Sequence, residues 1–297
     1  MDRILRSGRF GIPGIALAML LSVALSARAD EGASPARGEI LFKAADCVAC
    51  HTDVKGGGAP LAGGRPLVTP FGTFYSPNIT SDPSDGIGGW SEAEFRRALR
   101  QGIGKHGEYL FPVFPYPSFT GMTDQDISDL YAYLQSRPAV AKPDRPNDVS
   151  FPFSWRPLQM FWRWLFFSEG PLKPVAGQSA EWNRGRYLSE AVVHCGECHT
   201  PRDFLGGLKR SQAYSGNPQG PDGLKVPNIS NDDATGIGKW SVEDVTTLLK
   251  TGQTPDFDFV GAGMGDVVTG TATLSDADRR AIAVYVKSFP AIRSKKK

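Results

Sequence analysis

Apolar side chains recur at helical spacing in two stretches of the chain that lie about 150 residues apart. Ser91 precedes the first stretch and Gly102 follows it, while Ser241 and Gly252 bound the second stretch in the same way. An acidic residue stands three positions after each serine, which is the pattern of a capping box, and glycine commonly ends a helix. The pattern predicts two equivalent amphipathic helices. Their apolar positions are Phe95, Ala98 and Leu99 in the first helix and Val245, Leu248 and Leu249 in the second.

A second pair of helices is predicted to start at Thr123 and at Ser275, because apolar positions then follow along one face. Other segments echo each other at the same separation, such as Pro77–Thr80 with Pro227–Ser230. The echoes indicate two tandem copies of one small helical domain. The apolar positions of the second helix pair are Ile127, Leu130, Tyr131 and Leu134 in the first copy and Ile282, Val286 and Phe289 in the second.

Glycine and proline are abundant, with 34 glycines and 23 prolines in 297 residues. Such a chain has many turns, and long regular helices cannot account for most of it. We therefore expect an all-α fold in which small helical domains carry long loops rich in glycine and proline.

The N-terminus has the pattern of a secretory signal peptide. Three arginines fall within the first nine residues, an apolar stretch covers residues 15–25, and a small-x-small sequence that signal peptidase reads occupies residues 27–29. An apolar core of about a dozen residues is short for a membrane span, which needs about 20. We predict a cleavable signal peptide at residues 1–29 and a periplasmic mature protein that begins near Asp30. An uncleaved N-terminal membrane helix is the alternative.

Removal of the signal peptide changes the net charge of the chain. The whole sequence has a formal net charge of +2. Residues 1–29 carry four arginines and one aspartate, a charge of +3, so about −1 remains. A nucleic-acid partner would require a basic face, and this balance does not suggest one. The basic tail at residues 293–297 is interpreted as a solvated chain end.

All four cysteines lie in two copies of the pattern C-x-x-C-H, which is the signature of covalent haem attachment. Two thiols three residues apart on a helical turn can each add to one of the two vinyl groups of a haem. The histidine that follows then lies beneath the porphyrin and ligates the iron. The sequence predicts two covalently bound haem c groups. The attachment residues are Cys47, Cys50, Cys195 and Cys198, and the proximal ligands are His51 and His199.

Three other uses of the cysteines fit the sequence less well. Disulfides form in an oxidising compartment, but they give no reason for a histidine after both pairs. A four-cysteine zinc site would need two pairs about 145 residues apart to meet, whereas zinc-ribbon spacings are far shorter. A thioredoxin-like redox pair needs a βαβ context, which the pattern does not predict.

Methionine is the expected sixth ligand, because a haem that only transfers electrons usually has both axial positions filled and a thioether raises its potential. In the second copy, Met264 is the only methionine after residue 160 and lies in the glycine-rich segment 261–265. Methionine ordinarily fills a core, and a glycine loop is a poor place for that role. We predict His199/Met264 ligation for the second haem.

The sixth ligand of the first haem has three candidates. A shift of about 150 residues from Met264 leads to Phe114, which cannot ligate iron. Met122 is the only methionine in the first copy, but it corresponds to Leu274 just before a helix cap, where a hydrophobic staple is the simpler role. We predict Met122 as the ligand, with His106 or an open five-coordinate iron as the alternatives.

Five segments carry a family likeness: Trp90-Ser91, Gly107–Pro117, Thr120–Asp124, Glu181–Gly185 and Cys195–Arg202. Together they resemble the cytochrome c subunits of membrane-bound alcohol and sugar dehydrogenases and the related soluble diheme cytochromes c. The resemblance covers nearly the whole mature chain and implies two tandem class I cytochrome c-like domains wrapped around covalent haem. It also implies electron transfer from a periplasmic dehydrogenase towards a terminal oxidase or another cytochrome. Family members commonly carry three haem domains and a C-terminal membrane-binding stretch, whereas two attachment motifs are present here.

The repeats and the resemblance divide the chain into five predicted parts. Residues 1–29 form the signal peptide and residues 30–140 the first cytochrome c domain. Residues 141–178 form an interdomain linker, residues 179–292 the second cytochrome c domain and residues 293–297 the basic tail.

The linker is rich in aromatic side chains between residues 151 and 173. The simplest interpretation is a strap that packs across both haem domains. The alternative is a docking surface for a partner protein or the membrane interface, since aromatic residues are enriched at both.

The sequence favours an electron carrier over an enzyme. Two of the four histidines are assigned to iron, and the pattern offers no obvious serine or cysteine nucleophile with a histidine base. The expected partners are a dehydrogenase as donor and a cytochrome or oxidase as acceptor, with peripheral association with the membrane or a membrane complex as a further option. The alternative function is a haem enzyme whose first iron is open or unusually ligated and acts on a small oxidant or sulfur compound.

Overall fold

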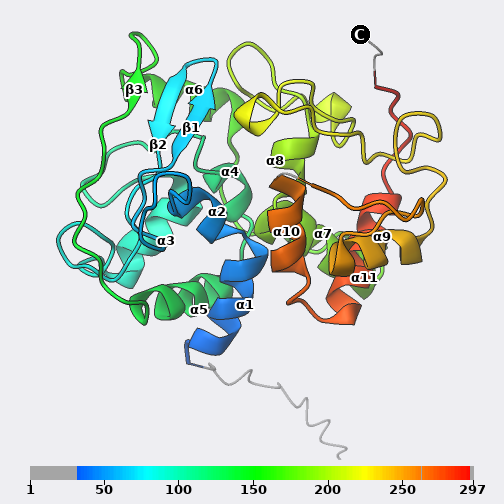
Figure 1. Cartoon of the computed structure of the whole chain (residues 1–297), viewed down its shortest axis with the longest axis horizontal. Helices are drawn as coiled ribbons and strands as arrows, with labels where there is room; N and C mark the ends of the chain where they lie inside the picture. The colour runs from blue at the N-terminus through cyan, green and yellow to red at the C-terminus, as the bar shows by residue number, and fades with distance from the viewer. Residues whose placement is uncertain (1–31, 262, 295–297) are drawn as a thin grey trace, which may run out of the picture. The chain divides into compact units, whose positions relative to one another are not determined.

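The computed structural model describes residues 32–261 and 263–294, and helices form most of its regular structure (Figure 1). The predicted signal peptide at residues 1–29 and Lys295–Lys297 of the basic tail lie outside the described residues. Residues 33–140, here called the first half, contain α1 Pro35–Ala44, α2 Cys47–His51, α3 Glu92–Gln101, α4 Tyr116–Phe119 and α5 Asp124–Gln135. The linker contains α6 Leu158–Phe166. Residues 179–294, the second half, contain α7 Ala180–Tyr187, the π-helical turn η1 Leu188–Val192, α8 Cys195–His199, the short 3₁₀ turns η2 Arg210–Gln212 and η3 Pro221–Gly223, α9 Val242–Thr251, α10 Gly263–Thr271 and α11 Asp276–Lys287.

The helices of the two halves follow one another in the same order. α2 matches α8, α3 matches α9, α5 matches α11, and α1 matches α7 together with η1. Thr123 caps α5 and Ser275 caps α11, and each side chain accepts a hydrogen bond from the backbone N–H three residues later. The predicted starts of this helix pair are therefore confirmed.

The ends of α3 and α9 are also those that the sequence predicts. Ser91 and Ser241 both form capping boxes with the acidic residue three positions later. Gly102 (φ 61°) and Gly252 (φ 77°) end the two helices in the left-handed conformation, which glycine adopts without steric cost.

One close helix crossing defines the frame of each half. In the first half α1 crosses α5, and in the second half α7 crosses α11. A Cβ atom added to Gly38 would lie 2.0 Å from the carbonyl oxygen of Asp129. One added to Gly185 would lie 1.9 Å from the carbonyl oxygen of Ala281. Only glycine allows the two backbones to approach this closely, and the same solution occurs in both halves.

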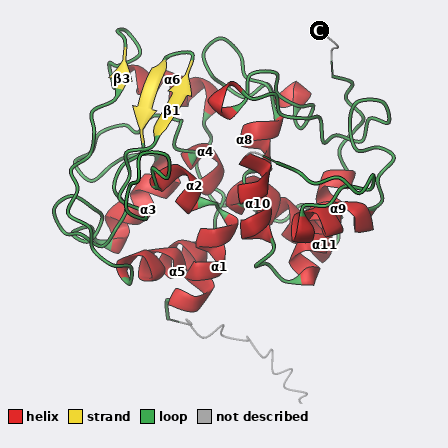
Figure 2. Ribbon diagram, in the orientation of Figure 1, coloured by secondary structure: helices red, strands yellow, loops and turns green. Residues whose placement is uncertain are grey.

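The expectation of an all-α fold is wrong in one region (Figure 2). β1 Pro66–Thr69 and β2 Gly72–Tyr75 form an antiparallel hairpin, and β3 Asp148–Val149 of the linker pairs with the other side of β2. The buried Phe74 of this sheet packs against Phe111, with ring centroids 5.0 Å apart. Short runs of β-branched and aromatic residues around a glycine turn form strands when a core covers one face, and helical periodicity does not detect them.

The two halves pack against each other, and their contacts group Ala33–Lys297 into one compact unit. α10 of the second half packs on α1 of the first, while α4 of the first half packs on η1 of the second. A Cβ atom added to Gly270 of α10 would lie 2.1 Å from the carbonyl oxygen of Lys43 in α1. Each half thus contributes helical elements to the interface.

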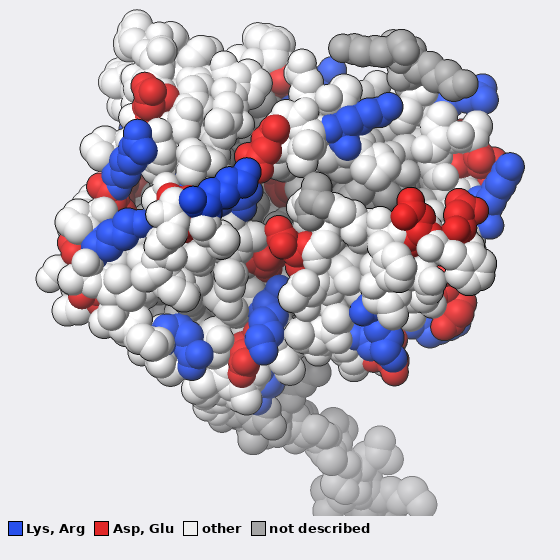
Figure 3. Space-filling view, viewed as in Figure 1, with Lys and Arg blue, Asp and Glu red and all other residues white. Residues whose placement is uncertain are grey.

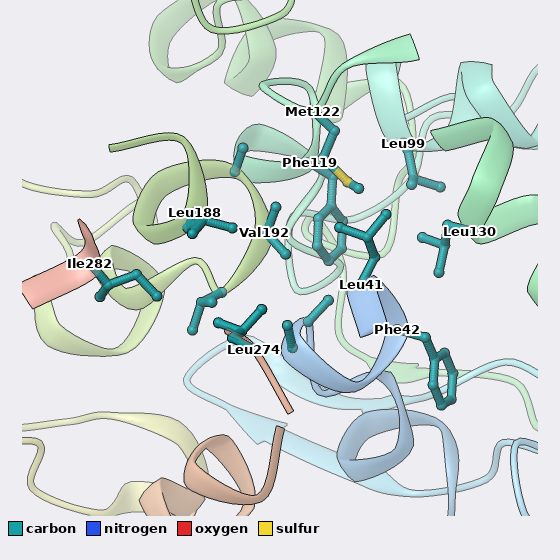
Figure 4. Close-up of a cluster of buried hydrophobic side chains, with 14 of the residues drawn as sticks. Leu41, Phe42, Leu99, Phe119, Met122, Leu130, Leu188, Val192, Leu274 and Ile282 are labelled. Atoms are coloured by element: carbon teal, nitrogen blue, oxygen red, sulfur yellow. The ribbon is translucent and has the colours of Figure 1, made fainter. Parts of the chain in front are cut away.

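One buried apolar cluster extends through this interface (Figure 4). It includes Leu41 of α1, Phe119 of α4 and Val192 of η1, together with Leu274 before α11. Because side chains from both halves bury their apolar surface in the same cluster, the hydrophobic effect stabilises the pairing of the halves as well as each half.

The linker contacts both halves through α6 and the segment before it. Trp162 Nε1 donates a hydrogen bond to the carbonyl oxygen of Leu205 in the second half (3.0 Å). The Trp162 ring also lies edge-on to Tyr116 of the first half, and Arg156 donates to the carbonyl oxygen of Tyr109 (2.6 Å). These contacts agree with the strap interpretation. Among the helices of the described residues, none has both the length and the apolar character needed to cross a membrane.

Candidate functional site

The two C-x-x-C-H motifs form the short helices α2 and α8, which have the same local geometry. Each follows a residue in the left-handed conformation, Asp46 (φ 51°) in the first half and His194 (φ 46°) in the second. Residues three apart on a helix are neighbours on its surface, so the two thiols of each motif lie side by side. The four free, partly buried thiols are those of Cys47, Cys50, Cys195 and Cys198.

The imidazole rings of the two motifs are held in the same way. His51 Nδ1 lies 2.8 Å from the carbonyl oxygen of Pro77, and His199 Nδ1 lies 2.8 Å from that of Pro227. A carbonyl oxygen can only accept, so Nδ1 carries the proton and the lone pair of Nε2 is available to a metal. Burial lowers the pKa of both histidines, which favours the neutral form that ligates iron.

A glycine loop supports the carbonyl group of each histidine. Gly63 N donates to the carbonyl oxygen of His51 (2.9 Å), and Gly216 N donates to that of His199 (2.8 Å). Both glycines have positive φ, 64° and 88°. A Cβ atom at Gly63 would lie 2.5 Å from the carbonyl oxygen of Ser76, so the loop can lie against the chain that holds the imidazole only because this residue is glycine.

The surroundings of the thiols differ from those of zinc or redox cysteines. Burial raises the pKa of Cys195 to about 12 and that of Cys198 to about 11, and it raises the pKa of Cys47 and Cys50 as well. Metal-binding and redox-active cysteines instead have lowered pKa values, because they react as thiolates. Within residues 32–261 and 263–294, no three His, Cys, Asp or Glu side chains converge to hold a bare metal ion. Each motif therefore offers two neutral thiols and one free imidazole nitrogen, which is the donor set that fits a covalently attached haem.

Met264 lies in the first turn of α10, where its partly buried side chain packs against the core cluster. The expectation that it lies in a glycine loop is wrong, because Gly263–Thr271 is helical. The helix forms despite its glycines because it packs on α1, and tertiary packing overrides weak local propensity. The packing places Met264 on a fixed element rather than on a loop.

Met122 is fully buried, and its side chain turns into the core beside Phe119 (Figure 4). It occupies the backbone position of Leu274, since the N–H of each donates to the carbonyl three residues earlier. Phe114, at the position of Met264, packs on Phe119 with ring centroids 5.5 Å apart. His106 is exposed in the loop after α3. Of the two candidate ligands in the first half, Met122 is thus the one inside the core.

The two motifs lie at the interface between the halves. His194 Nε2, just before the second motif, is 3.3 Å from the carbonyl oxygen of Ala45, just before the first. Burial raises the pKa of Cys198, and the negative charges of Glu197 on the same helix and of Cys50 in the other half raise it further. The residues that precede the two motifs are therefore in contact across the interface.

Polar contacts across the interface also connect each motif to the other half. Ser118 Oγ donates to Glu197 Oε1 of the second motif (2.9 Å), 79 positions away in sequence. Arg65 donates to the carbonyl oxygen of Ala49 in the first motif and pairs with Asp222 of the second half (2.9 Å), 157 positions away. The sequence analysis did not identify these residues, and no local pattern could have done so, because each partner is remote along the chain.

Asp46 and His194 occupy equivalent positions but respond to pH in opposite ways. Burial raises the pKa of Asp46 to about 7, and the negative charge of Asp266 on α10 raises it further, whereas the Ala49 backbone N–H and Arg65 oppose the shift. Burial lowers the pKa of His194. In both cases burial disfavours the charged form.

Asn78 and Asn228 follow the prolines that hold the two imidazoles. Asn78 Nδ2 donates to the carbonyl oxygen of Val140 (2.8 Å), and Asn228 Nδ2 donates to that of Ile292 (2.7 Å). Both bonds tie the proline loop to the chain that follows the last helix of its half. A signal was present in the sequence, because the two asparagines are part of the repeated Pro-Asn-Ile segment.

Helices around two C-x-x-C-H turns, each with an imidazole oriented for ligation, define a c-type cytochrome. Residues 35–138 match the family model described as cytochrome c. The chain is 43% identical over 261 residues to a diheme c-type cytochrome of Cereibacter sphaeroides, and the match covers 86% of each chain. The protein therefore belongs to the diheme c-type cytochromes and carries two covalently bound haem c groups.

Other relatives are cytochrome subunits of dehydrogenases. The chain is 39% identical to the cytochrome c subunit of the quinone alcohol dehydrogenase of Gluconobacter oxydans, with 98% of this chain and 63% of that protein covered. It is 40% identical to the cytochrome subunit of the fructose dehydrogenase of Gluconobacter japonicus, with 87% of this chain and 53% of that protein covered. The chain thus spans less than two thirds of either protein. Membership in this group of cytochromes implies electron transfer.

Proposed function

We propose that the protein is a periplasmic diheme electron carrier that takes electrons from a dehydrogenase and passes them towards a terminal oxidase or another cytochrome. Each haem c supplies an iron that accepts and releases one electron at a time. The observation that carries the proposal is the meeting of the two attachment motifs at one interface, where His194 contacts Ala45 and Cys50 influences Cys198. Two haems attached there are held close to each other by neighbouring helices.

Different residues of each half attach the haem and ligate its iron. The cysteines form the thioethers, and His51 and His199 ligate iron through Nε2 while Pro77 and Pro227 fix their rings. The sixth ligands are Met264, on α10, and Met122, inside the core of the first half. The four attachment cysteines are Cys47, Cys50, Cys195 and Cys198.

The interface contacts fix the relative position of the two motifs. The Arg65–Asp222 pair connects the turn of the first motif to the second half, and the Ser118–Glu197 bond connects the second motif to the first half. Electron transfer needs a constant separation between donor and acceptor, and the close contact of Gly270 with the backbone of α1 adds to this rigidity.

The location and the domain division complete the proposal. The signal-peptide pattern at residues 1–29 supports export to the periplasm. The repeated helices support two cytochrome c domains, residues 30–140 and 179–292, joined by the linker.

An exposed aromatic surface supports peripheral association with the membrane or with a membrane complex. Trp164 of α6 is 82% exposed, Phe204 of the neighbouring loop is 86% exposed, and Phe151 before α6 is 81% exposed. The Phe71 and Phe153 rings, 4.9 Å apart, continue the same surface. Aromatic residues are enriched where proteins meet membranes and partner proteins.

The proposal is tested by spectra of the purified holoprotein in the oxidised and reduced states. An electron carrier takes up two electrons per chain, keeps both irons low-spin and does not bind carbon monoxide. Two haems with histidine and methionine ligands also give a weak band near 700 nm, roughly as this ligation does in general. A high-spin haem that binds carbon monoxide would contradict the carrier function.

That contrary result would favour the alternative, a haem enzyme that acts on a small oxidant or sulfur compound. The observation behind this alternative is Phe114, which stands where the second half has Met264. Spectra of the Met122→Ala variant distinguish the two functions. If Met122 ligates the first iron, the substitution weakens the band at roughly 700 nm, and if the first iron is open in the native protein, the spectrum does not change.

A further inference from the structure

The loop after α3 and the loop after α9 have the same backbone structure. Ile103 bridges to Tyr109 in the first half, and Gln253 bridges to Phe259 in the second. Three backbone hydrogen bonds repeat at the same offset with lengths of 2.8, 3.1 and 2.8 Å in the first loop and 2.8, 3.0 and 2.9 Å in the second. We call residues 103–110 the first-half loop and residues 253–260 the second-half loop. Differences between the two loops therefore lie in their side chains and in what covers them.

The linker covers the loop of the first half. Arg156 donates to the carbonyl oxygen of Tyr109 (2.6 Å), and the Arg163 guanidinium lies 5.6 Å from the centre of the Tyr109 ring. Trp162 and Phe167 pack edge-on against Tyr116 beside it. Arginine and aromatic side chains thus leave Tyr109 only partly exposed.

The second-half loop lacks such a cover among the described residues. Phe259, the counterpart of Tyr109, is 63% exposed, and Phe257 is 82% exposed. Phe257 also has φ 62°, at the position where the first half has Gly107 with φ 83°. A bulky residue in this conformation is strained, and strain of this kind is concentrated at functional sites. Neither burial nor backbone geometry explains an exposed phenylalanine here.

Negative charge surrounds the two exposed phenylalanines. Asp256 and Asp258 are both exposed, and neither carboxylate forms an ion pair with another described residue. In the first-half loop, Lys105 donates to the carbonyl oxygen of Gly89 and Glu108 accepts from the backbone N–H of His106. In the second-half loop, Asp258 accepts from the backbone N–H of Phe259. Acidic side chains are visible on the part of the surface that carries α9 (Figure 3).

We propose that the second-half loop is the docking surface for a redox protein whose face presents basic and aromatic side chains. The chemistry follows from the first half, where arginine and aromatic residues cover the equivalent loop, and from the complementary charge of Asp256 and Asp258. The inference rests on the proposed electron-carrier function. The loop leads within a few residues to Met264, so a partner docked here would lie close to the residue proposed to ligate the second haem.

Stopped-flow electron transfer from the reduced holoprotein to a basic single-haem cytochrome c, used as the probe, tests the proposal. At low ionic strength, Asp256→Asn/Asp258→Asn should lower the second-order rate constant about tenfold or more, because electrostatic steering changes on-rates by about 10–10³. Phe257→Asn/Phe259→Ser should lower it by about tenfold as well, because truncating the aromatic side chains of a docking surface weakens the complex. The effect of the aspartate variant should vanish at high salt, whereas that of the phenylalanine variant should remain.

Two exposed residues outside the loop, one apolar and one acidic, serve as controls, Ile40→Ser and Glu169→Gln. They should leave the rate within about twofold of the native value, as surface positions outside a docking site do. Loop variants that transfer electrons at the native rate, or controls that lose as much, would overturn the docking proposal. Oxidation by ferricyanide at high salt separates this result from a failure of the carrier function. The small reagent needs no docking surface, its charge is screened at high salt, and it should react at an unchanged rate with every variant.

Discussion

The two halves of the molecule share one frame, and two of their differences concern the haem sites and the access to them. Both cross their first and last helices at a glycine, both start the attachment motif after a left-handed residue, and both hold the imidazole with a proline carbonyl group. They differ in the position of methionine, Met264 on α10 against Met122 in the core, and in the loop after the third helix, which the linker covers in the first half alone. The attachment motif and the frame around it are therefore duplicated, whereas the position of the methionine and the exposure of the loop are specific to each half.

The largest expected effect comes from removing one pair of attachment cysteines. Cys47→Ala/Cys50→Ala and Cys195→Ala/Cys198→Ala should each yield a protein with one haem instead of two, because each pair serves its own haem. Haem content is measured from the pyridine haemochrome spectrum against the protein concentration. A variant that keeps two haems, or loses both, would contradict independent attachment in the two halves.

Replacing the methionines separates the two halves most sharply. Met264→Ala and Met122→Ala should each remove about half of the weak band near 700 nm and lower the reduction potential of one haem, because a thioether ligand raises the potential. The control is Met160→Ala, whose side chain is 49% exposed on α6. If Met122→Ala leaves the band intact while Met264→Ala removes all of it, the first iron has another ligand or none.

The glycines at the helix crossings should be equally sensitive in both halves. Gly38→Ala and Gly185→Ala each place a methyl group about 2 Å from a carbonyl oxygen, and overpacking of this kind costs about 1–3 kcal/mol. The free energy of unfolding from urea titration of the holoprotein measures the loss. If only one of the two substitutions lowers the free energy of unfolding, the helices at the other crossing can move apart without cost.

Asp46 and His194, which precede the two motifs, should make the free energy of unfolding depend on pH in opposite directions. The raised pKa of Asp46, about 7 against an ordinary 3.8, means that the folded state binds more protons, so its contribution to stability falls as pH rises from about 4 to about 7. The lowered pKa of His194 means that the unfolded state binds more protons, so its contribution rises as pH approaches 6.5 from below.

Urea titrations of Asp46→Asn and His194→Gln between pH 4 and pH 8 measure these contributions. The first substitution should remove a fall in stability with pH, and the second should remove a rise. If both variants change the slope of the free energy of unfolding against pH in the same direction, the two residues do not have opposite pKa shifts.

The smallest expected effect concerns the helix caps. Ser91→Ala and Ser241→Ala should each lower the free energy of unfolding by about 1 kcal/mol, the usual loss for an N-cap serine. Both serines form capping boxes with the same geometry, so the two losses should agree within the error of a thermal or urea titration. A clear difference would indicate that one half unfolds before the other.

Much of the fold and of the site could be predicted because the signals are local. A cap and its partner lie three residues apart, and the thiols and imidazole of an attachment motif lie within five residues. The repeated segments then placed these features in both halves. The methionines could be found as residue types, but their surroundings could not be predicted, because the glycine-rich segment around Met264 becomes helical only through its packing on α1.

The sequence by itself determined the two pairs of capped helices, the two haem-attachment motifs and the repeated segments, since each follows from covalent spacing and short-range hydrogen bonds. Only the tertiary structure decided that the two motifs meet at one interface, that a strand of the linker completes a sheet with the first half, and that one of two equivalent loops is left uncovered by the described residues. These features depend on contacts between residues far apart in the chain. Such contacts form when apolar surface from both halves is buried together, and no short stretch of sequence records them.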